Sequence, residues 1–176
     1  FVKDPSQWAN VSYIIDADTI RGGSVLIGTD LNELTVSLTA SENIPAADSK
    51  PGYTLDWTYE TGETVVAGEN IVRGAYTAIP YTVTIVNGTL ENGETSGTFY
   101  IGDVVTIIAD DDTDEESFSK WTLDGEGAIE SAKSRTTTFT VGAGDATITA
   151  NYSPNTSYLK VINGIGSGEY TRGDEA

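Results

Sequence analysis

The chain has 176 residues, of which 27 are acidic and 9 basic, giving a net charge of −18, and it contains no cysteine and no histidine. This acidity argues against nucleic acid and against an anionic membrane surface as partners. The two absences exclude disulfide bonds, most zinc, copper and haem chemistry, and the Cys–His and Ser-His-Asp nucleophiles. No window approaches the roughly eighteen continuous apolar residues of a membrane span, so we expect no membrane insertion.

The first part of the chain has the pattern of a small β unit. Apolar and polar residues alternate over Val11–Ile15, which predicts a strand with one buried face, and Arg21-Gly22-Gly23 predicts a turn. Further along, Gly52–Trp57 predicts a strand that leads, through a turn at Gly62, into a strand pair.

The stretch from Tyr81 to Tyr152 predicts a more complete β unit. Apolar residues recur with period two over Tyr81–Ile85 and Val105–Ala109, and Asn87-Gly88 interrupts the first run. An acidic loop then precedes Trp121, and the final strand pattern closes at Tyr152.

Both flanks of this stretch match it when the sequence is shifted along itself. Upstream, Gly23–Gly28 matches Gly97–Gly102, and Val36–Ala40 matches Val105–Ala109. Trp57-Thr58 stands where Trp121-Thr122 stands, and Ala75–Tyr81 falls on Ala146–Tyr152 at an offset of 146 − 75 = 71. The chain therefore has the pattern of a tandem array with a period near seventy residues.

A third copy is predicted to begin near Tyr158. Thr82–Gly88 matches Tyr158–Gly164 at an offset of 158 − 82 = 76, and Ser96–Asp103 matches Ser167–Asp174 at an offset of 167 − 96 = 71. An isolated two-stranded hairpin is marginally stable in water, so we expect a neighbour to hold this fragment: copy two, another chain, or a continuation of the same chain.

These patterns predict an all-β fold of tandem small β-sandwich or open-barrel modules of about 70 residues each. The expected order is a linker or lead-in, a divergent first module, a second module, a short linker and the truncated start of a third, at residues 1–10, 11–80, 81–152, 153–157 and 158–176. The chain has no methionine, even at its first position, which indicates a processed product or an excised piece whose localisation signals would lie outside it.

The frame of the second module resembles a known bacterial family. It reads Tyr-x-Val-x-Ile…Asn-Gly, Gly-Thr-Phe-Tyr-Ile-Gly-Asp-x-Val-x-Ile-x-Ala, Phe-Ser-Lys-Trp-Thr and Ala-Thr-Ile-Thr-Ala-Asn-Tyr. This frame resembles the divergent internalin B-type repeat over residues 81–152, with the start of a further repeat at 158–176. Gly52–Trp57 is more similar to the parent internalin B-type repeat. The resemblance implies tandem all-β modules of large surface or secreted proteins, mostly of Gram-positive bacteria, or of the fibres of phages that infect them, with no catalytic residue and no cofactor.

The predicted function is therefore a non-enzymatic spacer or stalk module of an extracellular adhesin or fibre, at a cell or virion surface. Its expected partners are neighbouring repeats of the same or another chain. Two alternatives stay open. One is a module that binds a surface glycan or a host protein, and the other is a virion-decorating or filament-forming subunit completed by a neighbouring chain.

One loop offers a weak calcium candidate. Asp110, Asp112 and Asp114 occupy alternate positions, as the first oxygen ligands do in several calcium loops. An EF-hand loop would need glycine at its sixth position and glutamate at its twelfth, but these positions hold Glu115 and Trp121. The favoured interpretation is a solvated loop without a metal.

Three further patterns could indicate a binding or catalytic site, but each has a simpler structural interpretation. Arg172-Gly173-Asp174 spells an integrin-type tripeptide, but the repeat alignment makes it a turn entering a strand. Trp57 and Trp121 could stack on sugar rings, but their recurrence at one repeat position favours the core. The many carboxylates make some pair at glycosidase spacing inevitable, yet nothing places two of them in a concave site.

Overall fold

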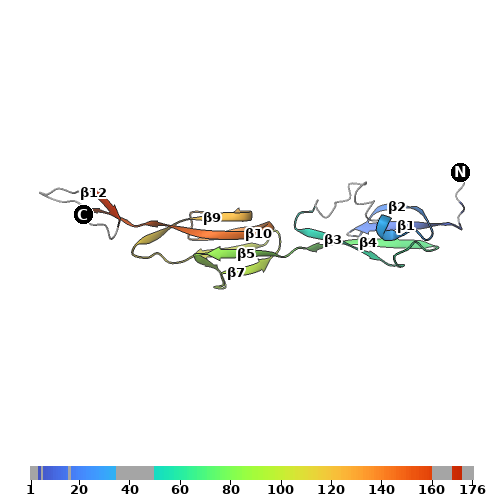
Figure 1. Ribbon diagram of the computed structural model, residues 1–176, viewed down its shortest axis with the longest axis horizontal. Helices are drawn as coiled ribbons and strands as arrows, with labels where there is room; N and C mark the ends of the chain where they lie inside the picture. The colour runs from blue at the N-terminus through green and yellow to red at the C-terminus, as the bar shows by residue number, and fades with distance from the viewer. Residues whose placement is uncertain (1–3, 5, 16, 35–49, 160–167, 172–176) are drawn as a thin grey trace. The chain divides into compact units, whose positions relative to one another are not determined.

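The computed structural model describes residues 4, 6–15, 17–34, 50–159 and 168–171 (Figure 1). The chain divides into two compact units, Phe1–Ile79 and Pro80–Ala176. Nearly all of the described secondary structure is strand, with one helical turn at 31–34. The prediction of an all-β fold is confirmed.

The first unit is built on one four-stranded sheet. Its strands are β1 (Trp8–Ile15), β2 (Asp18–Leu26), β3 (Tyr53–Tyr59) and β4 (Glu69–Ala78), in the order β2-β1-β4-β3. β1 and β4 run parallel, while the two outer pairs are antiparallel. The predicted alternation over Val11–Ile15 appears as burial of every second side chain, because one face of β1 lies on the core. Leu31 and Val65, which are both fully buried, belong to the same core cluster.

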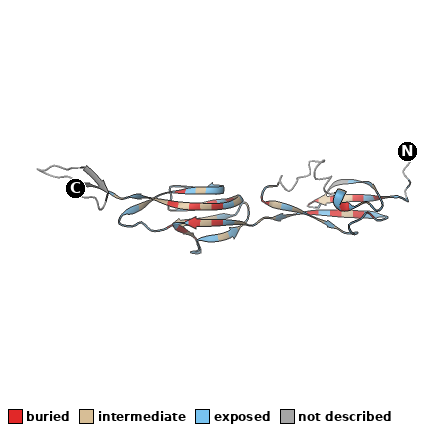
Figure 2. Ribbon diagram, in the orientation of Figure 1, coloured by how far each residue is buried: buried red, intermediate tan, exposed pale blue. Residues whose placement is uncertain are grey.

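The second unit has a larger sheet that is nearly barrel-shaped. Its strands are β5 (Tyr81–Val86), β6 (Gly88–Leu90), β7 (Ser96–Phe99), β8 (Val104–Ala109), β9 (Glu116–Ile129) and β10 (Thr136–Pro154). The order is β6-β8-β10-β5-β7, and β9 also pairs with β10. β10 pairs with β8 through 136–140 and with β5 through 146–149, so this one strand joins the two halves of the sheet. Buried residues alternate along β5 and β10 (Figure 2).

A bend in β9 and β10 lets one strand serve both halves. The register of the pair shifts between Val141 and Ala146. Gly125 and Gly127 opposite this shift have φ angles of 111° and 137°. A Cβ atom on Gly125 would lie 2.2 Å from the carbonyl oxygen of Asp145, so only glycine permits this approach of the two backbones.

The two units share one four-stranded frame. The strands β2-β1-β4-β3 of the first unit correspond to β7-β5-β10-β9 of the second in order and in direction. The registers agree as well: Val11 lies opposite Gly23 and Asn70, as Val83 lies opposite Gly97 and Ala146. The predicted match of Gly23–Gly28 with Gly97–Gly102 is therefore confirmed.

The tryptophans also take one place in this frame. Trp57 pairs with Gly74 across β3 and β4, and Trp121 pairs with Ala150 across β9 and β10. The hydroxyl of the next residue donates to a cross-strand carbonyl in both units: Thr58 to Arg73 at 3.3 Å and Thr122 to Thr149 at 3.5 Å.

One predicted match is wrong. The ladders place Asn70, and not Ala75, on Ala146, an offset of 146 − 70 = 76 instead of 71. A shift of five residues is odd, so it would turn every side chain of a strand to the other face. Ala75 is indeed exposed while Ala146 is buried.

The units differ where β8 begins. In the second unit Val104 pairs with Thr140 and opens the ladder between β8 and β10. At the equivalent place in the first unit, Asp30 forms only an isolated bridge with Thr64. The Asp30 carboxylate then accepts the backbone N–H of Asn32 at 2.7 Å, as an N-cap does, and the helical turn follows. The strand predicted at Val36–Ala40 lies outside the described residues.

The boundaries of the predicted linkers can be compared with the strands. β1 begins at Trp8, within the predicted lead-in 1–10, and β10 extends to Pro154, within the predicted linker 153–157. A separate antiparallel pair follows, β11 (Thr156–Leu159) and β12 (Gly168–Thr171). The remaining residues of the predicted third module, 160–167 and 172–176, lie outside the described part of the chain.

Candidate functional site

The acidic loop 110–116 folds against the end of β10, where the chain leaves the second module. The carboxylate of Asp112 accepts the backbone N–H of Phe118 at 2.7 Å and pairs with the guanidinium of Arg135. The hydrogen bond from the Phe118 N–H lowers the pKa of Asp112 below its ordinary value of 3.8; desolvation opposes this in part, and the hydrogen bond and charge of Arg135 lower the pKa further.

Arg135 is the cation that the loop holds. Its Nη1 donates to the carbonyl oxygen of Asp110 and lies 3.9 Å from the Asp111 carboxylate, and its Nη2 reaches Asp112. The guanidinium carbon also lies 5.9 Å from the centre of the Phe118 ring, within the range of a cation–π contact. Arg135, which lies in the turn before β10, therefore connects Asp110, Asp111 and Asp112 to the ring of Phe118.

Tyr152, near the end of β10, packs under the loop. Its hydroxyl donates to the carbonyl oxygen of Asp110 at 2.7 Å. Its ring meets Phe118 edge-on at a centroid distance of 6.1 Å. Burial, followed by the charge of Asp110, raises the pKa of the Tyr152 hydroxyl above 10.0, so this group stays protonated and remains a donor at neutral pH.

Asn155, the residue between β10 and β11, is fastened to the same loop. Its backbone N–H donates to the carbonyl oxygen of Glu115 at 2.7 Å. Its side-chain amide donates to the carbonyl oxygens of Thr113 and Asp114, both at 3.1 Å, and its side-chain oxygen accepts the hydroxyl of Ser117. These bonds fix the point at which the chain leaves the second module.

The first module ends in a similar arrangement. The N–H of Ile79 donates to the carbonyl oxygen of Gly52 at 2.8 Å, which is the counterpart of the bond from Asn155 to Glu115. Tyr76, the counterpart of Tyr152, meets Tyr53 edge-on at 6.3 Å. The Lys50 ammonium lies 4.3 Å and 4.2 Å from the centres of these two rings. Each exit thus combines a tyrosine of the last strand, an aromatic side chain of the strand paired with it, and a basic residue over at least one of the rings.

We call these two clusters the exit clusters: Lys50, Tyr53, Tyr76 and Ile79 in the first module, and Phe118, Arg135, Tyr152 and Asn155 in the second. Neither cluster is predicted from the sequence. Tyr76 and Tyr152 are 152 − 76 = 76 residues apart, so the correct offset would have paired them, whereas the offset of 71 hid the match.

The three residues of the calcium alternative, Asp110, Asp112 and Asp114, all lie in the acidic loop. Among the residues that the structure describes, no group of three or more Asp, Glu, His or Cys side chains is placed to hold a metal ion. Of Asp110, Asp112 and Asp114, the first and last use backbone carbonyls to bind Arg135, Tyr152 and Asn155, and Asp112 already has a cationic partner. The geometry therefore gives the calcium alternative no support.

The aromatic side chains proposed for sugar stacking lie mostly in the cores. Trp121 is 2% exposed, and its indole N–H donates to the carbonyl oxygen of Ser134 at 3.0 Å, so its predicted core role is confirmed. Trp57 is half-buried and packs edge-on against Tyr13 at 6.5 Å. Arg172-Gly173-Asp174 lies outside the described residues.

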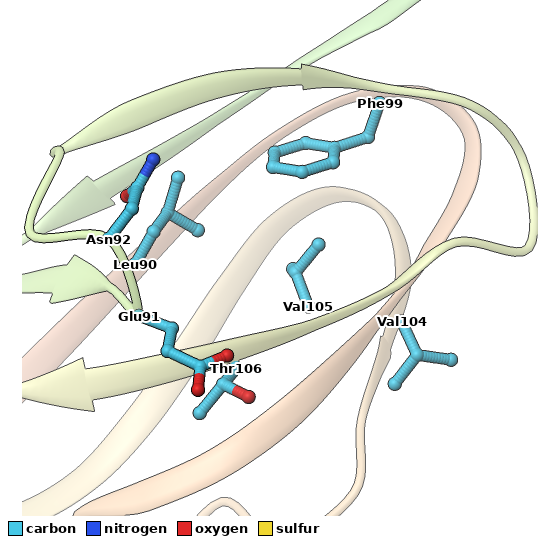
Figure 3. A pocket seen from close by; sticks show the side chains of 7 residues that line it. All are labelled: Leu90, Glu91, Asn92, Phe99, Val104, Val105 and Thr106. Atoms are coloured by element: carbon cyan, nitrogen blue, oxygen red, sulfur yellow. The ribbon is translucent and has the colours of Figure 1, made fainter.

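One shallow hollow opens on the second module between β6, β7 and β8. It has a volume of about 230 Å³, and Leu90, Phe99 and Val105 point into it, while Val104 lies at its edge, 63% exposed (Figure 3). Glu91, Asn92 and Thr106 complete its lining. No titratable pair or nucleophile with a base converges there, so the hollow has no catalytic arrangement.

Comparison with known proteins identifies the second module. Residues 81–156 match the family described as the divergent InlB B-repeat domain. This segment is similar to that repeat family. The resemblance drawn from the sequence is thus confirmed over this segment, and the family consists of surface repeats and not of enzymes. No curated protein matches the chain.

The second module of this chain is therefore a bacterial surface repeat. A solved structure described as "Crystal structure of Mub-RV" aligns with 82% of this chain and 99% of its own, at 12% identity and a TM-score of 0.25. Within the described residues, no helix is long and apolar enough to cross a membrane.

Proposed function

We propose that this chain is a non-enzymatic spacer of an extracellular bacterial surface protein, in which short joints connect successive InlB-type repeats. The observation that carries the proposal is the recurrence of the joint. Ile79 and Asn155 each make the last backbone bond of a module, and Tyr81 and Ser157 are each paired two residues later in the next hairpin. Only Pro80 lies between Ile79 and the first paired residue of β5, and the pairing of β11 begins at Thr156, directly after Asn155.

Short joints suit a spacer because they leave little chain to move freely. A flexible linker shortens the mean separation of the domains it connects, since its end-to-end distance grows only as the square root of its length. At these joints at most one residue separates two hydrogen-bonded positions, so length is added module by module. The acidic surface supports the same role, because like charges on neighbouring chains repel each other.

Small-angle X-ray scattering tests the proposal. The chain would be compared with a longer version in which residues 81–156 are duplicated in tandem. A spacer predicts that the maximum dimension grows by about one module length with the added copy, and that it changes little between low and high salt. A maximum dimension that does not grow would contradict the proposal, as would saturable binding of a defined glycan in an array through the second module.

A further inference from the structure

The first and last strands of each module lie side by side and run parallel. In the first module these strands are β1 and β4, and in the second they are β5 and β10 (Figure 1). The first ladder joins residues 10–15 to 69–74, and the second joins 83–86 to 146–149. In both modules, the strand by which the chain enters is therefore bonded directly to the strand by which it leaves.

Because the two strands are parallel, the entry and the exit lie at opposite ends of the ladder. In the second module the chain enters at Tyr81, where β5 begins, and leaves at Pro154, where β10 ends. Tension in the flanking chain then pulls β5 and β10 past each other along their length. The hydrogen bonds of a ladder cross from strand to strand, so this pull loads all of them together, in shear. An antiparallel pair would have its entry and exit at one end and would open one bond at a time.

Each strand of the pair is also held by a second partner. β1 is paired with β2 and β4 with β3, while β5 is paired with β7 and β10 with β8 and β9. The inward side chains along the second ladder, at Val83, Ile85, Ala146 and Ile148, are buried. Neither strand is a sheet edge, so sliding one past the other also exposes core side chains to water, which costs free energy.

Side chains lengthen the shorter of the two ladders. The ladder of the second module has four residue pairs and that of the first has six. Before the first pair of the second module, the N–H of Thr82 donates to the carboxylate of Asp145 at 2.7 Å. Beyond the last pair, the side-chain amide of Asn87 donates to the carbonyl oxygen of Ala150 at 3.1 Å. Both bonds connect β5, or the residue after it, to β10, so both add to the resistance in shear.

We propose that this parallel pair is a force-bearing clamp in each module, and that the chain carries tension between the polypeptide segments on either side of it. This function goes beyond the spacer, because a spacer needs only length, whereas a tether must stay folded under load. The clamp predicts that resistance to unfolding depends on the direction of pulling. Equilibrium stability has no such direction, so the two contributions can be separated by experiment.

Single-molecule force spectroscopy on the full chain tests the clamp of the second module. The chain has no cysteine, so a pair of introduced cysteines defines the two points of pulling. Pro80→Cys is the common anchor, and it is combined with either Ser153→Cys or Ala143→Cys, all at exposed positions. Ser153 lies at the far end of the ladder and loads it in shear, whereas Ala143 lies at the same end as Pro80 and peels the strands apart. We expect the unfolding force to be at least about twofold higher in shear than in peeling.

The first module allows an independent repeat of this comparison. Gln7→Cys would be combined with Thr77→Cys, at the far end of its ladder, or with Glu69→Cys, at the near end. All three side chains are exposed. The same order of forces is expected, with shear above peeling. Equal forces in the two geometries, or a higher force in peeling, would overturn the clamp.

Asn87→Gly tests the side-chain bond at the end of the second ladder. Glycine accepts the backbone of residue 87, whose φ is 58°, and removes only the amide that bonds to Ala150. Under constant force, we expect about fivefold faster unfolding in shear and no change in peeling from the Pro80 end, where this bond breaks last. Asn92→Gly, in the hairpin before β7, is the matched control.

Two results would overturn the role of Asn87 in the clamp. One is an unchanged unfolding rate of Asn87→Gly in shear, and the other is an equal acceleration in both geometries, which would reflect a general loss of stability. Scattering measures the extension of the chain without load. The spacer and the clamp can therefore fail independently of each other.

Discussion

The two modules keep the same four-stranded frame but cover it differently. Both pair Val11 or Val83 with a strand on each side in one register, and both end in an exit cluster. Over this frame the second module places β6, β8 and the first half of β10, whereas the first has a helical turn that begins after Asp30. Main-chain pairing between the four strands therefore defines the repeat, while the layer that covers these strands can differ without altering their order or register.

The interior of the frame also differs at one position. Asn70, which is fully buried, occupies the place that Ala146 occupies in the second module. Its side-chain oxygen accepts the N–H of Val66 at 2.9 Å and the hydroxyl of Thr61 at 3.0 Å. Its amide donates to the carbonyl oxygens of Val66 and Asn10, at 2.9 and 3.2 Å. The first module therefore organises the turn 61–68 with a buried polar group, where the second uses an apolar contact.

The largest effect is expected for Phe139→Ala, which tests whether the covering layer of the second module stabilises that module alone. Phe139 is fully buried, and its removal leaves a cavity that costs about 3–5 kcal/mol of unfolding free energy. Denaturant unfolding followed by tryptophan fluorescence should show one transition displaced and the transition of the first module unchanged. Thr140→Ala, at an exposed neighbouring position, is the control. A loss shared by both transitions would mean that the modules do not unfold separately.

Substitutions at Asn70 and Ala146 test the frame position at which the interiors of the two modules differ. Asn70→Ala should destabilise the first module by about 3 kcal/mol, because several backbone groups of the turn lose a buried partner. Ala146→Asn should destabilise the second module by about 1–3 kcal/mol, since it introduces a polar group into an apolar site. Glu69→Ala serves as an exposed control. If Asn70→Ala is neutral, the buried network does not hold the turn.

Alanine substitutions at the glycines that lie against Trp57 and Trp121 should destabilise the two modules unequally. A Cβ atom on Gly88 would lie 2.5 Å from the carbonyl oxygen of Ile108 and 2.9 Å from the Trp121 ring, so the backbone itself must move. A Cβ atom on Gly74 would lie 2.7 Å from the Trp57 ring, which is half-buried and can shift. Gly88→Ala should therefore cost about 2–3 kcal/mol and Gly74→Ala about 1 kcal/mol, measured as changes in unfolding free energy. The reverse order would show that Trp57 is the more tightly held ring.

The exit cluster of the second module should give a smaller effect. Asn155→Ala removes the side-chain bonds to Thr113 and Asp114 and should cost about 1 kcal/mol of unfolding free energy. It should also speed hydrogen exchange at the N–H of Asn155 itself, which the loop otherwise covers. Thr156→Ala, one residue beyond the fastening, provides the matched comparison. Unchanged exchange at residue 155 would show that the side chain does not hold the loop.

The smallest effect concerns pH. Because the folded-state pKa of Asp112 lies below its unfolded value, this carboxylate stabilises the second module above about pH 4, and the contribution is lost as pH falls through the folded-state pKa. Asp112→Asn should remove this part of the acid dependence, measured from unfolding curves between pH 2 and 6. The first module, which has no counterpart of Asp112 in its exit cluster, should keep its own pH profile. An unchanged profile for the second module would contradict the role given to Asp112.

The strands were predictable where period-two alternation meets glycine turns. Val11–Ile15 and Tyr81–Ile85 alternate cleanly, and Gly28 and Gly102 both adopt positive φ, 89° and 87°, at equivalent turns. The same regularity caused the error at Ala75. Ala and Tyr recur in several strands, so two strand segments can match at both ends in a register that places their side chains on opposite faces of the sheet. Only the hydrogen-bond ladder decides between such registers.

The exit clusters could not be predicted from one sequence. Arg135 reaches the loop from a turn that lies nineteen residues after Glu116, the last residue of the loop. Asn155 has the sequence context of an ordinary linker residue. The charge of the loop suggested a solvated loop, with calcium as the alternative, because a sequence shows the acidic side chains but not which backbone carbonyl groups the loop uses. Contacts between segments distant in the sequence determine which of these groups is used.

The central claim, that one β frame is present twice in one register, can be tested by cross-strand nuclear Overhauser effects in the full chain. The account predicts contacts from Val11 to Asn70 in the first module and from Val83 to Ala146 in the second, between parallel strands. Contacts from Val11 to Ala75 in place of Asn70 would contradict it.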